Sequence, residues 1–229
     1  MKKALSIVFS LCIAAAILFA AVSCGKTDSE VKGEPKTVYE YYENGNVKKS
    51  SDYDAKGNLI KESYYDREGK LDGYLVYEND ENGNVIKGLC YDADGNIGYY
   101  SVAEYDENGN MKKISHYYAD GNIDYYSVYE YDENGNKTKE SIYDADGKLE
   151  CVYEFDENGK KTKSSGYDAD GKLKYAYEFD ENENKTKALW YGYNADGKLS
   201  SYIVSEYDEN GNKTKESCYD AEGNLIYSK

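Results

Sequence analysis

Turn glycines recur along almost the whole chain at intervals of 12 or 14 residues. The first is Gly45 and the last is Gly223, and Glu183 stands where one more glycine is expected. Every interval is even, and side chains along a β-strand alternate between two faces, so each repeat keeps the side-chain pattern of the one before it. In a helix, by contrast, an insertion of two residues would rotate the following side chains to another side. The spacing therefore predicts a series of β-strands joined by tight turns.

The residues around each glycine predict the type of turn. Asp stands three residues before the glycine in most repeats, and Asn or Asp often stands directly before it. Asp can accept a hydrogen bond from the backbone two residues on, and Gly adopts positive φ at low steric cost. We expect a three-residue loop, in which a type I turn is closed by a G1 bulge, between strands of about nine residues. A two-residue type I′ loop is the alternative.

A three-residue loop pairs the residue four before the glycine with the residue two after it. The first position is aromatic in most repeats, with Asn79 as the exception, and the second is often Leu or Lys. We expect the aromatic residues on one face of the sheet and a row of valines on the other. The aromatic residues are Tyr53, Tyr65, Tyr91, Tyr105, Tyr117, Tyr131, Tyr143, Phe155, Tyr167, Phe179, Tyr193, Tyr207 and Tyr219, and the valines are Val76, Val102, Val128, Val152 and Val204.

Asn-Gly and Asp-Gly turns alternate from Asn82 to Asn210, and the last turn has Glu222. Successive turns of an antiparallel meander lie on opposite edges, so each turn type would occupy its own edge. The repeating unit is then a two-stranded hairpin of 24–26 residues that needs its neighbours for stability. The predicted fold is an all-β array of antiparallel hairpins over residues 38–229. It could form an extended meander, a coiled single-layer sheet or a solenoid.

The first residues differ from the rest. Lys2 and Lys3 precede an apolar run that ends in AVSC at 21–24. This pattern is typical of a secretory signal, and AVSC resembles a bacterial lipobox. We expect a signal peptide over 1–23, a lipidated Cys24 and a flexible tether over 24–37. The chain would then be a bacterial membrane-anchored protein, in the periplasm or on the cell surface. A plain signal peptide and an uncleaved membrane anchor are the alternatives.

The repeat phrases resemble two known families. YDENGN and YDADGKL are similar to the YD repeats of bacterial RHS-type proteins, and YYENGNVKKS with the later KLDG resembles the MORN-type variant repeat of bacterial lipoproteins. Both resemblances imply β-hairpin arrays that act as scaffolds, binding surfaces or shells. The Arg that is typical after the YD-repeat glycine is replaced by Asn or Lys, so no toxin role is carried over.

Composition argues against several function classes. The formal net charge of −16 disfavours nucleic acid, which requires clustered Lys and Arg. His116 is the only histidine, so histidine-based catalysis and His-rich metal sites are not expected. DADGNI at 92–97 lacks the outer ligands of an EF-hand loop, so we predict neither a metal nor another cofactor. The nearly equivalent turn carboxylates provide no asymmetric catalytic pair, and we predict a protein that is not an enzyme.

The aromatic residues are the candidate contact residues. The chain has 29 tyrosines, and extra ones stand in the longer repeats. Tyrosine is amphipathic and rigid, so exposed rows of it suit protein partners and also sugars. We predict an acidic, Tyr-rich surface for protein–protein interaction at the cell envelope. A glycan- or peptidoglycan-binding module and a purely structural spacer are the alternatives. The predicted binding residues are Tyr99, Tyr100, Tyr125, Tyr126 and Trp190.

Overall fold

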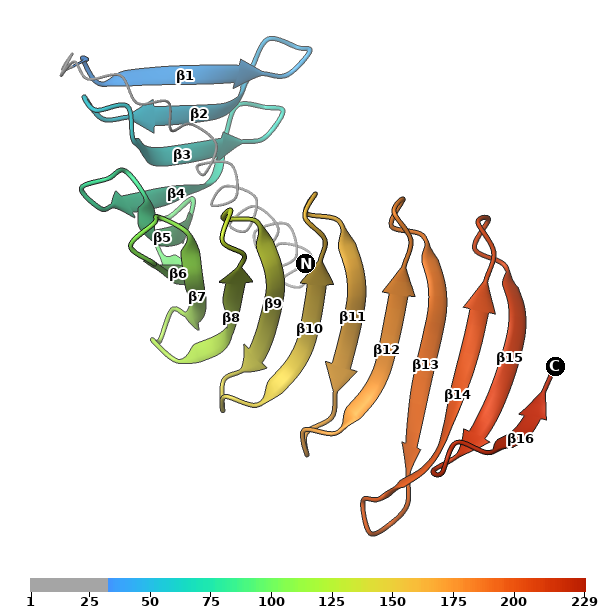
Figure 1. Ribbon diagram of the computed structural model, residues 1–229. Helices are drawn as coiled ribbons and strands as arrows, with labels where there is room; N and C mark the ends of the chain where they lie inside the picture. Colours follow the sequence, from blue (N-terminus) through green and yellow to red (C-terminus); the bar gives the residue numbers. More distant parts are fainter. Residues whose placement is uncertain (1–32) are drawn as a thin grey trace. The chain divides into compact units, whose positions relative to one another are not determined.

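The computed structural model describes residues 33–229, so the predicted signal peptide and Cys24 lie outside the described residues. In the described part of the chain, sixteen strands follow one another in chain order in one open antiparallel sheet (Figure 1). Residues 33–229 contain no helix, and so none that could span a membrane. The predicted all-β hairpin array is confirmed.

The strands contain between 4 and 9 residues, and β1 begins at Lys36, slightly before the predicted start of the array. They are β1 (Lys36–Tyr41), β2 (Val47–Tyr53), β3 (Leu59–Tyr65), β4 (Leu71–Asn79), β5 (Val85–Asp92), β6 (Ile97–Tyr105), β7 (Met111–Tyr118), β8 (Ile123–Tyr131), β9 (Lys137–Asp144), β10 (Leu149–Phe155), β11 (Lys161–Tyr167), β12 (Leu173–Phe179), β13 (Lys185–Tyr193), β14 (Leu199–Tyr207), β15 (Lys213–Asp220) and β16 (Leu225–Ser228).

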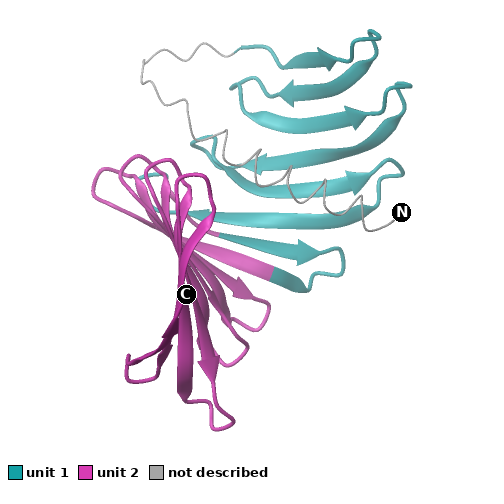
Figure 2. Cartoon of the chain, turned by 90° about the vertical axis from the view of Figure 1, so that its right-hand side faces the viewer, with its two compact units in different colours: residues 1–109, 114–124 teal, residues 110–113, 125–229 magenta. Residues whose placement is uncertain are grey.

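The described residues form two compact units (Figure 2). Unit 1 holds the described residues up to 109 together with 114–124, and unit 2 holds 110–113 and 125–229. Within each unit a strand is hydrogen-bonded to the strands before and after it in the chain. The stability of each strand therefore depends on its immediate neighbours, as in other repeat proteins.

The turns have the predicted three-residue loop. In the β2–β3 turn, the Gly57 amide donates to the Asp54 carbonyl at 3.0 Å, and the Asp54 amide donates to the Asn58 carbonyl at 2.9 Å. The turn glycines have φ between 72° and 89°. Glu183 has φ 60° and is the only residue other than glycine with positive φ in the described part of the chain. This geometry is a type I turn with a G1 bulge, so the type I′ alternative is excluded.

The turn carboxylates are used inside the turns. Asp54 Oδ1 accepts hydrogen bonds from the amides of Lys56 and Asn58, both at 2.8 Å, and Asn58 Nδ2 donates to Oδ2 at 2.9 Å. The bond from the Asn58 amide is the largest cause that holds the pKa of the Asp54 carboxyl below its ordinary value. Among residues 33–229 no group of His, Cys, Asp and Glu is arranged to hold a metal ion.

Asn79 occupies the position of a turn tyrosine and makes the hydrogen bond that the tyrosine makes in other repeats. Tyr105 and Tyr193 donate their hydroxyls to the carbonyls of Val85 and Leu173, at 2.9 Å and 2.8 Å. Each acceptor lies 20 residues upstream of its donor. Asn79 Nδ2 makes the equivalent bond to the Leu59 carbonyl at 2.9 Å. The amide therefore ties the turn to the preceding hairpin as the tyrosine hydroxyl does elsewhere.

The hairpins outside β6–β8 also contain a second bulge, which the even spacing does not reveal. Phe155 pairs with Lys161, but Glu154 pairs with Lys163, so Thr162 is an extra residue in β11. Thr162 Oγ1 donates to the Glu154 carbonyl at 3.2 Å. Bulged backbone leaves ladder groups unpaired, and this hydroxyl satisfies one of them. The same threonine bond occurs in the other KTK repeats, at Thr138, Thr186 and Thr214.

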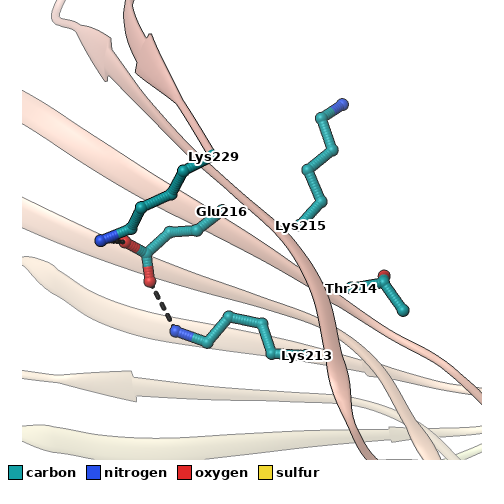
Figure 3. Close-up of a pocket in the computed structure, with 5 residues that line it drawn as sticks. All are labelled: Lys213, Thr214, Lys215, Glu216 and Lys229. Atoms are coloured by element: carbon teal, nitrogen blue, oxygen red, sulfur yellow. Dashed lines mark hydrogen bonds and ion pairs between the residues drawn. The ribbon is translucent and has the colours of Figure 1, made fainter.

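The second bulge changes which face a side chain reaches. Lys213 and Lys215 are two residues apart and would share a face in a regular strand. Instead Lys213 bonds Glu216 at 2.5 Å, and Lys215 lies 3.4 Å from Glu206. In Figure 3, Lys213 points toward Glu216 while Lys215 extends the other way. The bulge at Thr214 separates them.

The prediction that all turn aromatic residues share one face is therefore wrong. In unit 2, Tyr143 lies on the same face as Ser141, which pairs with Val152, so it joins the valine row. Phe155 lies on the same face as Tyr153, which is the opposite one. Aromatic residues before Asp-Gly turns share the face of Val152, and those before Asn-Gly turns share the other face. Because Trp190 belongs to that second surface, we call the two the Val152 face and the Trp190 face of unit 2.

Replacing Glu183 tests the turn geometry. We expect Glu183→Gly to raise the free energy of unfolding by about 0.5–1 kcal/mol, because glycine adopts positive φ without the cost that Glu incurs. Gly159→Ala, at the equivalent place one hairpin earlier, should lower it by a similar amount. Urea unfolding of both variants checks this, and a less stable Glu183→Gly protein would contradict the assignment.

Candidate functional site

Two of the predicted contact residues, Tyr99 and Tyr100, are neighbours in β6 and point to opposite faces. Tyr99 donates its hydroxyl to Asp124 and meets the Tyr118 ring edge-on, with ring centroids 5.7 Å apart. Tyr100 is stacked on Tyr117 with centroids 4.7 Å apart. Both rings are thus engaged with neighbouring strands of their own unit.

Tyr125 and Tyr126 are likewise adjacent in β8 and cannot share a face. Tyr126 is stacked on Tyr143 at 4.9 Å, and Lys113 Nζ lies 4.7 Å from the Tyr126 ring centroid. The structure therefore does not bring the four predicted tyrosines together into one site. Adjacent residues of a strand are directed apart by the pleat.

Trp190 is the predicted contact residue that does form a cluster. Its side chain in β13 is 44% exposed. The indole lies 5.5 Å from the Tyr175 ring and 5.8 Å from the Tyr177 ring, measured between centroids. Tyr175 and Tyr177 alternate along β12 on the same face, and their rings are 5.0 Å apart. Three aromatic rings thus lie together on an open sheet surface.

Small residues on neighbouring strands make room for these rings. Gly166 pairs with Tyr175, and a Cβ at Gly166 would collide with the Tyr175 ring. Tyr177 pairs with Ser164 on one side and Ala188 on the other. The Tyr175 hydroxyl lies 3.8 Å from Cys151 Sγ, and burial raises the pKa of Tyr175 to about 12. The rings lie over the backbone of the adjacent strands, as aromatic residues do beside strand glycines.

Two lysines flank the rings. Lys161 Nζ lies 5.7 Å from the Tyr153 ring and 4.6 Å from the Phe179 ring. Lys185 Nζ lies 5.4 Å from the Tyr177 ring and 4.2 Å from the Tyr207 ring. These are cation–π distances, and such contacts hold a lysine over apolar surface at modest desolvation cost.

The two repeats with these lysines lie between two KTKES repeats, at 137–141 and 213–217, which carry a glutamate three residues after the first lysine. Lys137 pairs with Glu140 at 3.1 Å, and Lys213 pairs with Glu216, which Lys229 also contacts at 3.2 Å (Figure 3). The corresponding residues of the two middle repeats, KTKSS and KTKAL, are Ser164 and Ala188.

Across residues 33–229, no carboxylate lies within ion-pair distance of Lys161 Nζ or Lys185 Nζ. Carboxylates still lie near Lys161, because its backbone amide donates to Glu183 Oε1 at 3.2 Å and Glu140 lines the same hollow. The two middle repeats thus combine an exposed indole and half-buried rings with two ammonium groups that form no ion pair. We call this surface the Trp190 platform, and it consists of Lys161, Tyr175, Tyr177, Phe179, Lys185 and Trp190.

A buried Ser–His contact in unit 1 is a second cluster, which sequence reasoning did not find. Ser101 Oγ and His116 Nδ1 are 2.8 Å apart. The exposed fractions of Ser101 and His116 are 1% and 6%, so no substrate reaches them. Burial lowers the pKa of His116 to about 4, although the nearby Asp124 acts in the opposite direction. The contact serves packing rather than nucleophilic catalysis, because the serine is enclosed.

Comparisons with known families support a β-repeat protein. A sequence family described as a protein of unknown function (DUF2963) matches residues 117–166 and 167–218. The MORN repeat variant matches residues 36–55 and 102–117, which confirms the MORN-like character of the repeats. A search of curated proteins finds no match.

Solved structures give only distant likenesses. The TcdB2-TccC3 structure without its hypervariable C-terminal region is 14% identical, with a TM-score of 0.35, and the match covers 80% of this chain and 12% of that one. A porin-like protein from Bacteroides uniformis is 11% identical, with a TM-score of 0.32 and coverage of 84% and 97%. The chain spans about an eighth of the length of TcdB2-TccC3.

The buried histidine predicts a pH dependence. The folded state holds His116 neutral down to a pKa of about 4, against an ordinary value of 6.5, so the unfolded chain takes up the proton first. The free energy of unfolding should fall between pH 6.5 and pH 4, by about 3 kcal/mol at most. Urea unfolding across this range checks it. His116→Gln should flatten the curve, and a parallel curve would contradict the assignment.

Proposed function

We propose that this chain is a non-enzymatic repeat protein that binds a macromolecular partner through the Trp190 face of unit 2. It would act at the bacterial cell envelope, with a lipid on Cys24 as its anchor. The repeats would then be a scaffold that holds the contact surface in fixed register. The sequence predicts contact through Tyr99, Tyr100, Tyr125, Tyr126 and Trp190. The geometry supports Trp190 together with Tyr175 and Tyr177 instead of the four predicted tyrosines.

The observation that carries this proposal is the Trp190 platform itself. Trp and Tyr are enriched among the residues that dominate binding energy, and here an exposed Trp190 lies against the half-buried Tyr175 and Tyr177 on one face of a sheet. The ammonium groups of the two lysines lie over aromatic rings and form no ion pair among residues 33–229, in a chain with a net charge of −16. An exposed, locally cationic aromatic surface on an acidic protein favours contact with another molecule over packing alone.

The absence of enzymatic activity is part of the proposal. The only histidine is buried, and turn aspartates such as Asp54, Asp80 and Asp132 accept hydrogen bonds from the amides of their own turns. Groups held in this way are poorly suited to proton transfer, which needs a positioned side chain within reach of substrate. These features support a binding role.

The anchor can be tested directly. We expect Cys24→Ala to abolish incorporation of labelled palmitate and to move the protein from the membrane to the soluble fraction. A single acyl chain binds membranes only marginally, whereas the several chains of a bacterial lipoprotein hold firmly. Fractionation of cells that express each form measures this. Unchanged membrane association of the variant would contradict lipid anchoring at Cys24.

The contact surface can be tested on isolated cell envelopes. We expect Trp190→Ala combined with Tyr177→Ala to reduce retention of the full-length protein about tenfold or more, because these rings would form the centre of the interface. Tyr143→Ala, which removes a stacked ring from the Val152 face, is the matched control and should retain binding. Equal retention of the folded double variant and the wild type would contradict the proposal.

A further inference from the structure

We infer that the Trp190 platform binds an acidic glycan, a polysaccharide whose sugars carry carboxylate groups. A sugar ring would stack on the exposed indole of Trp190, which Tyr175 and Tyr177 support, and two carboxylates along the polymer would meet Lys161 and Lys185. This inference rests on the proposed binding role of the platform and names the class of its partner.

The aromatic part of the platform suits a pyranose ring. The C–H bonds on one side of a sugar ring carry partial positive charge, and they pack against the electron-rich face of an aromatic ring. Trp190 is 44% exposed, and Tyr175 and Tyr177 are half-buried beside it. The neighbouring Ser164, Gly166 and Ala188 are small, so no side chain on their strands rises above the rings at those positions. The surface is open enough for a polymer to lie across it.

The spacing of the lysines suits a polymer with separated charges. Lys161 and Lys185 occupy the same repeat position on β11 and β13, which are two strands apart. Adjacent strands are about 4.8 Å apart, which places the two lysine backbones roughly 10 Å apart. A glycan with one carboxylate per disaccharide presents its charges at a comparable interval. An extended peptide repeats its side chains on one face about every 6.8 Å, which is a poorer match.

Charge complementarity favours a slender ligand over an acidic protein. Glu140 and Glu216 neutralise the lysines at either end of the row, so the unpaired cations are confined to the two middle repeats. The remaining surface belongs to a chain with a net charge of −16. A broad acidic protein would be repelled over much of its area, whereas a single polysaccharide chain can lie within the cationic strip. Screening over about 8 Å at physiological salt limits repulsion from more distant carboxylates.

Binding of hyaluronan oligosaccharides to the full-length, detergent-solubilised protein tests the inference. These oligosaccharides carry one carboxylate per disaccharide. We expect measurable binding by calorimetry that weakens with added salt, and binding about tenfold or more weaker for carboxyl-reduced hyaluronan and for the Trp190→Ala variant. Poly-glutamate should bind at least about tenfold more weakly than hyaluronan.

The repeats themselves supply the matched variant. Ser164→Glu with Ala188→Glu restores the acids that the neighbouring repeats contain, so each lysine would gain a carboxylate partner as Lys137 has in Glu140. We expect this double variant to stay folded and to lose binding about tenfold or more. Lys213→Ser, which removes a paired lysine and leaves Glu216 with Lys229, should leave the affinity for hyaluronan unchanged.

Three results would overturn the inference. They are equal binding of poly-glutamate, equal binding of carboxyl-reduced hyaluronan, and no binding of hyaluronan at all. If hyaluronan fails but retention on cell envelopes still depends on Trp190 and Tyr177, the glycan is wrong and the proposed function stands. If envelope retention is also independent of these rings, the proposed function fails as well.

Discussion

The structure depends on the positive φ of the residue that closes each turn. That conformation fixes a three-residue loop, and the loop fixes the register of the two strands it joins. Each strand then has only its neighbours to stabilise it, because one sheet provides no second layer to pack against. The chain fills this thin layer with stacked tyrosines, lysine stems that lie on rings, and buried serines such as Ser101, Ser127 and Ser217. Tyrosine suits such a sheet because it covers apolar area and still reaches a carbonyl or water with its hydroxyl.

The second bulge gives this repetitive sheet two different faces. One extra residue after each turn, Thr162 in β11, shifts the pairing and exchanges the faces of all later side chains in that strand. As a result the aromatic residues before Asn-Gly turns and those before Asp-Gly turns separate. Lysines two residues apart, such as Lys213 and Lys215, also separate. Small changes in one repeat then alter a local surface without disturbing the fold. Ser164 and Ala188 stand where the neighbouring repeats have Glu140 and Glu216. This difference leaves Lys161 and Lys185 without the glutamate that pairs with Lys137 and Lys213, and the Trp190 platform depends on it.

The turn chemistry was predictable from sequence because it is local. Asp54, Gly57 and the residues between them determine the loop, and the even spacing of glycines predicted the antiparallel array. The faces were not predictable, because a bulge adds a residue to one strand without changing the spacing of the glycines. For the same reason Tyr99 and Tyr100 were grouped as contact residues although the pleat directs them apart.

Trp190 was found by its rarity, but Tyr175 and Lys185 join it only through cross-strand pairing. A comparison of KTKES with KTKSS and KTKAL would have indicated the unpaired lysines.

Disulfide trapping tests the central claim most directly, because the two registers place different residues beside Cys151. With the second bulge, Ile142 pairs with Cys151 although Tyr143 pairs with Leu149. Without it, the same turn would place Ser141 there. Paired strand residues lie within the Cα separation of about 4.4–6.8 Å that a disulfide requires. The account predicts that Ile142→Cys forms a disulfide with Cys151 under mild oxidation, mapped by mass spectrometry, and that Ser141→Cys does not. A disulfide to residue 141 and none to residue 142 would contradict the bulged register, and with it the separation of the two faces.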